Sequence, residues 1–134
     1  MSARVNVGSG APWEPVVGYS RVVRVGNQVW VAGTTAAGPD GGLRGGADAG
    51  AQTTTVLAKI ASALESVGAS LAHVVRTRIY VTDIADWEAV GRAHGDVFRD
   101  IRPACTLLAV ARLIAPELRV EIEADAVIPD GEPR

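Results

Sequence analysis

The chain of 134 residues has one cysteine, one lysine and few aromatic side chains. Its single cysteine, Cys105, excludes an intrachain disulfide and is typical of a protein kept in a reducing cytoplasm. Aromatic residues make up 4% of the sequence, so platforms on which nucleic-acid bases stack are not expected. The chain has no apolar run near the ~20 residues that span a membrane, and no basic-then-apolar signal segment. These absences predict a cytoplasmic protein with no membrane partner.

The charge balance argues against a nucleic-acid partner. The formal net charge is −2, whereas surfaces that bind phosphates usually carry an excess of Lys and Arg. Because Lys59 is the only lysine, almost all positive charge is arginine. Arginine keeps its charge when it is desolvated and can bind a carboxylate through two hydrogen bonds. Apolar content of 48% over this length predicts one globular domain, residues 1–134.

The first half of the chain predicts a β-hairpin. Residues 19–25 and 28–34 are rich in β-branched side chains, and Gly26 and Asn27 separate them. A Gly-Asn pair in this position is typical of a two-residue hairpin turn. Pro12 and Pro15 predict that residues 11–18 are extended rather than helical. Residues 1–10 are expected to be irregular or to form a loose edge strand.

Two amphipathic helices follow from the spacing of apolar residues. The glycine-rich residues 36–50 are predicted to form a surface loop, with a lid over a cleft as the alternative. A helix is predicted from about residue 49 to residue 67, because apolar side chains recur there every three or four positions, and Gly68 ends it. A second helix is predicted after Asp83 or Asp86 as its cap, with Trp87 among its apolar positions.

Two segments alternate as strands do. In residues 74–82 one face carries Val75, Thr77, Ile79 and Val81, while Arg76, Arg78 and Tyr80 lie on the other. Residues 101–127 contain two apolar runs joined by a short turn with a proline. In the second run one face carries Arg119, Glu121, Glu123 and Asp125, and the other carries Val120, Ile122, Ala124 and Ala126. We expect the charged faces of these segments to pair across neighbouring strands.

The predicted fold class is therefore α+β, with the order β-β-α-β-α-β-β. One sheet carries both helices on one face. The opposite face is charged and uncovered, and it predicts a symmetric oligomer without fixing the number of subunits.

Three segments in this order resemble the reactive intermediate/imine deaminase family, the RidA or YjgF type. They are VVGYSRVVRVGNQVWVAGTT, VVRTRIYVTDIADW, and RPACTLLAVARL followed by VEIEADAV, and together they reach from about residue 16 to residue 127. The resemblance implies a chorismate-mutase-like α+β fold. It also implies a homotrimer with a central barrel and clefts between subunits that bind a small molecule. Deaminase members of the family hydrolyse enamines and imines to a 2-keto acid and ammonia without a cofactor.

The resemblance also implies roles for six residues. Glu121 matches the family's glutamate, which holds the hydrolytic water as a general base. The other matching positions are predicted to bind substrate or line the cleft: Tyr19, Gly33, Thr34, Trp87 and Cys105.

Cys105 departs from the family pattern, which has at this position an arginine that binds the substrate carboxylate. A thiol cannot replace a charge-assisted, two-bond contact. Either another arginine reaches the cleft, or the ligand is not a small 2-imino acid, or the deaminase chemistry is absent. Arg102 and Arg112 are candidates for a replacement, although strand parity places Arg112 on the face opposite Cys105. The family's asparagine in the second helix is Gly91 here.

Two further possibilities carry less weight. Cys105 has no neighbouring base in the sequence, so passive lining of the cleft is favoured over covalent catalysis. His73 and His94 have no third ligand at metal-binding spacing, so no metal site is expected.

Two function classes stay open. One is a hydrolase of imines or enamines, and the other is a non-catalytic trimer that binds a metabolite or protects a partner.

Overall fold

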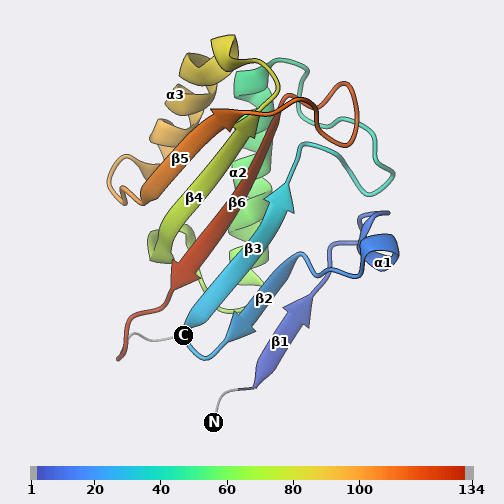
Figure 1. Ribbon diagram of the computed structural model, residues 1–134. Coiled ribbons are helices and arrows are strands. Elements are labelled where there is room, and N and C mark those ends of the chain that lie inside the picture. The colour runs from blue at the N-terminus through green and yellow to red at the C-terminus, as the bar shows by residue number, and fades with distance from the viewer. Residues whose placement is uncertain (1–2, 132–134) are drawn as a thin grey trace.

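The computed structural model describes residues 3–131, so what was predicted for residues 1–2 and 132–134 lies outside the described part. In chain order the main elements are β1 (Arg4–Val7), α1 (Glu14–Val17), β2 (Val22–Val25), β3 (Gln28–Thr34), α2 (Ala49–Glu65), β4 (Val74–Val81), α3 (Trp87–Phe98), β5 (Ala104–Ala109) and β6 (Val120–Val127). Single 3-10 turns lie at Leu71–His73 and Ile84–Asp86. The α+β class is confirmed, with one sheet and two main helices that lie on the same side of it (Figure 1).

The sheet has six strands in the order β1-β2-β3-β6-β4-β5. Every neighbouring pair is antiparallel except β4 and β5, which are parallel and are connected through α3. The central β6 lies between β3 and β4, as Figure 1 shows. The predicted order contained five strands; the sixth is β1, the loose edge strand offered as one alternative for residues 1–10.

The hairpin and the first long helix form where local signals placed them. Val25 pairs with Gln28 across the turn, and Gly26 adopts the positive φ of 60° that the turn needs. The carboxylate of Asp48 accepts a hydrogen bond from the Ala51 amide at 2.9 Å and caps α2. Gly68, with a φ of 84°, follows the end of that helix.

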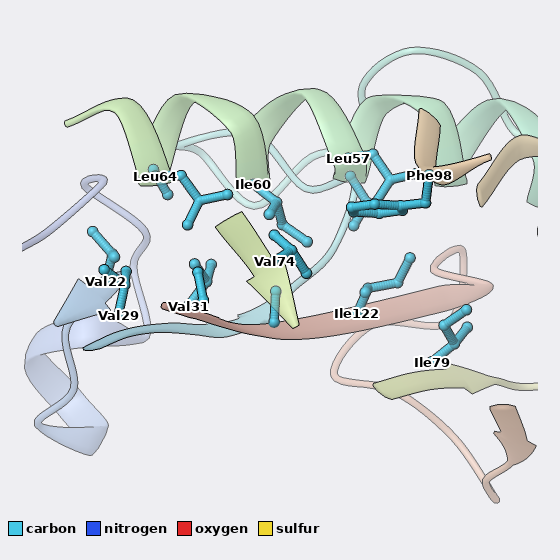
Figure 2. Packing of buried hydrophobic residues seen from close by; sticks show 14 of the residues in the cluster. Val22, Val29, Val31, Leu57, Ile60, Leu64, Val74, Ile79, Phe98 and Ile122 are labelled. Carbon is cyan, nitrogen blue, oxygen red and sulfur yellow. The ribbon is translucent and has the colours of Figure 1, made fainter. Parts of the chain in front are cut away.

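The core lies between the sheet and α2, with α3 closing one end. Figure 2 shows Leu57, Ile60 and Leu64 of α2 pointing toward the sheet, with Phe98 beside them. Buried sheet residues meet them from β2, β3, β4 and β6, among them Val22, Val29, Val31, Val74, Ile79 and Ile122. Burial of these side chains supplies the main stabilisation of the fold.

The charged sheet face is uncovered by helices, and its side chains pair as predicted. The Arg78 Nη1 atom lies 3.3 Å from a carboxylate oxygen of Glu123 and 3.3 Å from one of Asp125. Tyr80 on the same strand donates a hydrogen bond to Glu123 at 3.1 Å. The exposed side chains of Trp30 and Leu108 are on strands of the same sheet, at positions that pair with Asp125 and Tyr80.

Three local predictions are wrong. Residues 14–17 are one turn of helix rather than extended chain, because Pro15 occupies the first turn, where no amide hydrogen is needed. Val75 does not share the face of Thr77, Ile79 and Val81: it is 49% exposed, because an irregularity between Val74 and Arg76 shifts the register and Val74 takes the inner position. The link between β5 and β6 is the ten-residue segment 110–119 rather than a short turn.

Candidate functional site

The carboxylate of Glu121 lies directly over Gly33. Glu121 is on β6 and points away from the helices, and the pairing of β3 with β6 is irregular between Val31 and Thr34. A Cβ atom added to Gly33 would collide with Oε2 of Glu121. Glycine at this position therefore leaves the space that the glutamate side chain fills.

Burial controls the protonation of Glu121. Desolvation raises the pKa of this carboxyl above its usual value, and the nearby carboxylate of Glu123 raises it further. The positive charge of Arg21 acts in the opposite direction and lowers the pKa. The outcome is a raised pKa, which brings the titration of Glu121 toward neutral pH and suits a group that both accepts and donates protons.

Arg21 connects Gly33 to Tyr19. Its side chain is 8% exposed. The Nη1 atom donates hydrogen bonds at 2.6 Å to the carbonyl oxygen of Gly33 and at 2.9 Å to the hydroxyl oxygen of Thr34. The Nη2 atom donates to the hydroxyl oxygen of Tyr19 at 3.3 Å. Because Tyr19 accepts this bond, its own O–H is oriented to donate to another group.

These residues line a cavity of about 690 Å³ at the end of the sheet where β3 finishes. Its walls come from the segment around α1, from β3, from the loop that follows β3 and from α2. The polar or charged side chains in the lining belong to Ser9, Tyr19, Arg21, Thr35, Arg44, Thr55, Lys59 and Glu121. Apolar residues such as Trp13, Val17 and Ile114 complete it. The volume is suited to a small molecule.

The loop of residues 35–48 forms part of this cavity. The Nζ atom of Lys59 on α2 donates hydrogen bonds to the carbonyl oxygens of Thr35 at 2.6 Å and Ala37 at 2.7 Å. Gly38 and Pro39 also line the cavity. The glycine-rich loop is thus tied to α2 and contributes a wall of the cavity.

The structure brings together three of the six predicted site residues. Tyr19, Gly33 and Glu121 line the cavity. Thr34 is buried beside it, where its hydroxyl accepts from Arg21 and donates to the carbonyl oxygen of Ala32. Trp87 is 57% exposed at the start of α3, and Cys105 is exposed on the edge strand β5, so within one chain neither lines the cavity.

Neither predicted replacement arginine is in this cavity. Arg112 lies in the segment after β5, so the strand parity that was used to place it does not apply. Arg102 has a φ of 54° and donates a hydrogen bond to the carbonyl oxygen of Arg99. The arginine whose charge acts on Glu121 is Arg21, which was not among the predicted site residues. Arg21 follows Tyr19 by two positions, and this spacing was the available signal.

Within residues 3–131, the structure contains no group of three or more His, Cys, Asp and Glu side chains arranged to hold a metal ion. No helix in this part of the chain is long and apolar enough to cross a membrane. The Nε2 atom of His94 instead lies 2.9 Å from the hydroxyl oxygen of Thr77.

The family model described as Endoribonuclease L-PSP matches residues 10–128. The chain belongs to this family, the YjgF/RidA family. Among solved structures of the YjgF/RidA fold, Rv2704 of Mycobacterium tuberculosis, a member of the YjgF/YER057c/UK114 family, is 51% identical in sequence with a TM-score of 0.86. The match covers 94% of this chain and all of Rv2704.

Two further relatives are similar to this chain over most of their length. An uncharacterised Streptomyces coelicolor protein is 39% identical over 90% of this chain and 89% of its own. The 3-aminoacrylate deaminase RutC of Acinetobacter baylyi is 30% identical over 84% of this chain and 88% of its own. The predicted family and fold are therefore confirmed.

Proposed function

We propose that this YjgF/RidA-family protein hydrolyses small reactive imines or enamines, without a cofactor, to a carbonyl compound and ammonia. The observation that carries the proposal is the half-buried Glu121, whose carboxyl has a raised pKa and lines a cavity suited to a small molecule. Similarity to the 3-aminoacrylate deaminase RutC supports the same class of reaction.

The chemistry needs one group that can take up and return a proton. Water adds to the carbon of a protonated imine, and ionised Glu121 takes a proton from that water as the C–O bond forms. Neutral Glu121 then gives the proton to the nitrogen of the resulting carbinolamine. The C–N bond breaks, the hydroxyl proton goes to the leaving ammonia, and the C=O bond forms. One protonated imine and one water give one carbonyl compound and one ammonium ion.

An enamine enters this sequence after protonation at carbon, for which Glu121 in its neutral form is the acid. A glutamate with an ordinary pKa would be almost entirely ionised at neutral pH and rarely able to do this. Burial of Glu121 raises its pKa and increases the neutral fraction. Tyr19, oriented by Arg21, would donate a hydrogen bond to the substrate, while Gly33 leaves room for Glu121.

The direct test is ammonia release from enamines generated in situ by a pyridoxal-phosphate-dependent dehydratase acting on threonine. The protein is expected to accelerate ammonia release over buffer, and Glu121→Gln is expected to lose this acceleration. If the wild-type protein gives no acceleration while it binds a small molecule in the cavity, the alternative function, a non-catalytic metabolite-binding protein, replaces the deaminase.

We further propose that the active form is the homotrimer, with the uncovered sheet faces turned inward. Exposed Trp30 and Leu108 on the sheet support such a contact, because large apolar side chains exposed on a sheet favour burial against another chain. In this assembly Trp87 and Cys105 would line the cavity of a neighbouring subunit. The exposure of Trp87 at the start of α3 and of Cys105 on the edge strand β5 leaves them available for that role.

Sedimentation equilibrium tests the assembly. Wild-type protein is expected to sediment as three chains, and Leu108→Glu is expected to give folded single chains with reduced activity. A wild-type protein that sediments as a folded single chain would reject the trimer. If Cys105 lines the cavity of a neighbouring subunit, Cys105→Arg should raise activity on 2-imino acids. Unchanged activity would show that Cys105 does not line that cavity.

A further inference from the structure

Arg21 is a buried cation that no carboxylate of residues 3–131 contacts. Its hydrogen-bond acceptors are the carbonyl oxygens of Ala32 and Gly33 and the hydroxyl oxygens of Thr34 and Tyr19, all of them neutral. Its Nε atom is enclosed and has no hydrogen-bond partner. Within the described chain, no carboxylate lies within ion-pair distance of this guanidinium. A buried charge in this state favours the approach of an anion.

A second cation is close to Arg21. Lys59 donates hydrogen bonds to the carbonyl oxygens of Thr35 and Ala37. Like Arg21, it forms no ion pair with a carboxylate of residues 3–131. Burial lowers the pKa of Lys59, and the positive charge of Arg21 lowers it further. Two like charges that affect each other in this way would be stabilised by one anion between them.

Both cations are accessible to a ligand in the cavity. Arg21 and Lys59 line the cavity of about 690 Å³ and also a second one of about 580 Å³ beside it. The two cavities share four residues, Ser9, Arg21, Thr55 and Lys59. Among residues 3–131, Glu121 is the only acidic residue in either lining, and Arg44, the third cation, is paired with Asp40 at 2.8 Å. The walls therefore carry an excess of positive charge.

The position of Arg21 also relates the anion to the reacting group. Arg21 donates a 2.6 Å hydrogen bond to the carbonyl oxygen of Gly33, and the carboxylate of Glu121 fills the space over the same glycine. An anion bound by Arg21 and a reactive carbon next to Glu121 would therefore both lie beside Gly33. A short molecule with a carboxylate next to its imine carbon fits this arrangement.

We infer that Arg21 and Lys59 form an anion subsite that binds the carboxylate of a small 2-oxo or 2-imino acid. The subsite supplies, from the cavity of the same chain, the charge that Cys105 does not supply. The identity of the ligand rests on the proposed function, whereas anion binding is measured independently of catalysis.

The test measures binding of 2-oxobutanoate and of its uncharged methyl ester by isothermal titration calorimetry at constant ionic strength. Wild-type protein is expected to bind the acid more tightly than the ester. Arg21→Gln and Lys59→Met are each expected to weaken binding of the acid by about tenfold or more, while the ester is affected less. Two variants are used because Arg21 also holds Gly33 and Thr34, and Arg21→Gln could impair folding.

Arg24→Gln is the matched control. Arg24 is three positions from Arg21 and also donates to carbonyl oxygens, those of Gly26 and Val67, but it lines neither cavity. This variant is expected to keep the wild-type preference for the acid. If Arg24→Gln loses the preference as strongly as Arg21→Gln does, the effect is not specific to the subsite and the inference is rejected.

The outcomes separate this inference from the proposed function. Equal binding of acid and ester by wild-type protein, or an unchanged preference in both subsite variants, overturns the anion subsite even if ammonia release is accelerated. Selective binding of the acid that depends on Arg21 and Lys59, without any acceleration of ammonia release, supports the subsite and rejects the hydrolase.

Discussion

Gly33 and Glu121 occupy one site on the uncovered face of the sheet: the glutamate carboxylate fills the space where a side chain at residue 33 would be. The two residues come from neighbouring strands, β3 and β6, whose pairing is irregular just before Thr34. A local irregularity of the sheet and the absence of one side chain therefore hold the proposed catalytic group in place.

Gly33→Ala is expected to displace the Glu121 carboxylate and to reduce ammonia release by about 10²-fold, because catalysis is sensitive to ~1 Å displacements. The backbone at Gly33 has no positive φ, and the atom that an alanine would meet is the end of a flexible side chain. The variant should therefore fold, which circular dichroism and thermal unfolding would verify.

Gly95→Ala is the control for that substitution. Gly95 is inside α3, and apart from its chain neighbours and the adjacent helix backbone nothing lies within 4 Å of the position that its Cβ would take. Alanine there should stabilise the helix by about 0.5–1 kcal/mol and leave activity unchanged. Wild-type activity in Gly33→Ala would show that the position of Glu121 over residue 33 has no role in catalysis.

Glu121→Gln is expected to reduce ammonia release by about 10²- to 10⁴-fold and to increase the stability of the fold at high pH. Burial raises the pKa of Glu121 in the folded state above its ordinary value of 4.5. The folded protein therefore binds this proton more tightly than the unfolded chain does. As pH rises from the unfolded value through the raised folded value, wild-type stability decreases relative to Glu121→Gln.

Urea denaturation of both proteins at pH 4 and pH 8 measures this difference. Glutamine lacks the charge and has a similar size, so the two proteins should be closest in stability at pH 4, and the variant should be more stable at pH 8. A constant difference between the two at both pH values would mean that burial does not shift the pKa of Glu121.

Local signals determined which elements could be predicted. The Gly26-Asn27 turn and the stop at Gly68 each depend on neighbours in the sequence, and both are present. The helical turn at residues 14–17 differs from the prediction, because Pro12 and Pro15 favour extended chain only when they lie outside the first turn of a helix. Pro15 instead lies in the first turn, where a proline is tolerated.

The site was only partly predictable for a different reason. The family resemblance provided Tyr19, Gly33 and Glu121, and these do line one cavity. Arg21 and Lys59 are brought to it by long-range contacts: Arg21 reaches β3, and Lys59 reaches the loop after β3. Periodicity gives the face of an element on which a residue lies but not its partners. The spacing from Tyr19 was the one signal for Arg21, and Lys59 had none.

Arg78→Gln is expected to destabilise the fold by about 1 kcal/mol at neutral pH. Arg78 contacts both Glu123 and Asp125, and without it these two carboxylates repel each other across the sheet face. The Arg78 side chain is 39% exposed, so solvent screening limits the effect. Chemical denaturation at low and high salt should show a difference from wild type that shrinks as salt increases.

Arg92→Gln is the comparison for this prediction. Arg92 pairs with Glu88 on the exposed surface of α3, where both side chains are more than half exposed, and its loss should cost about 0.5 kcal/mol or less. If Arg78→Gln costs no more than Arg92→Gln, the pairing on the sheet face does not stabilise the fold.

His94 is expected to make the fold less stable as the pH falls below neutral. Burial lowers its pKa below the ordinary value of 6.5, so the unfolded chain binds a proton more tightly than the folded protein does. Stability from neutral His94 is present above the unfolded value and is lost as pH falls from there through the lowered folded value. Its Nε2 atom lies 2.9 Å from the hydroxyl oxygen of Thr77, and its ring packs against Phe98 with centroids 4.6 Å apart. Thermal unfolding of wild type and His94→Gln between pH 5 and pH 8 measures the effect. The melting temperature of the wild type should fall more steeply toward pH 5 than that of the variant. Parallel curves of melting temperature against pH would show that His94 does not contribute to the acid sensitivity of the fold.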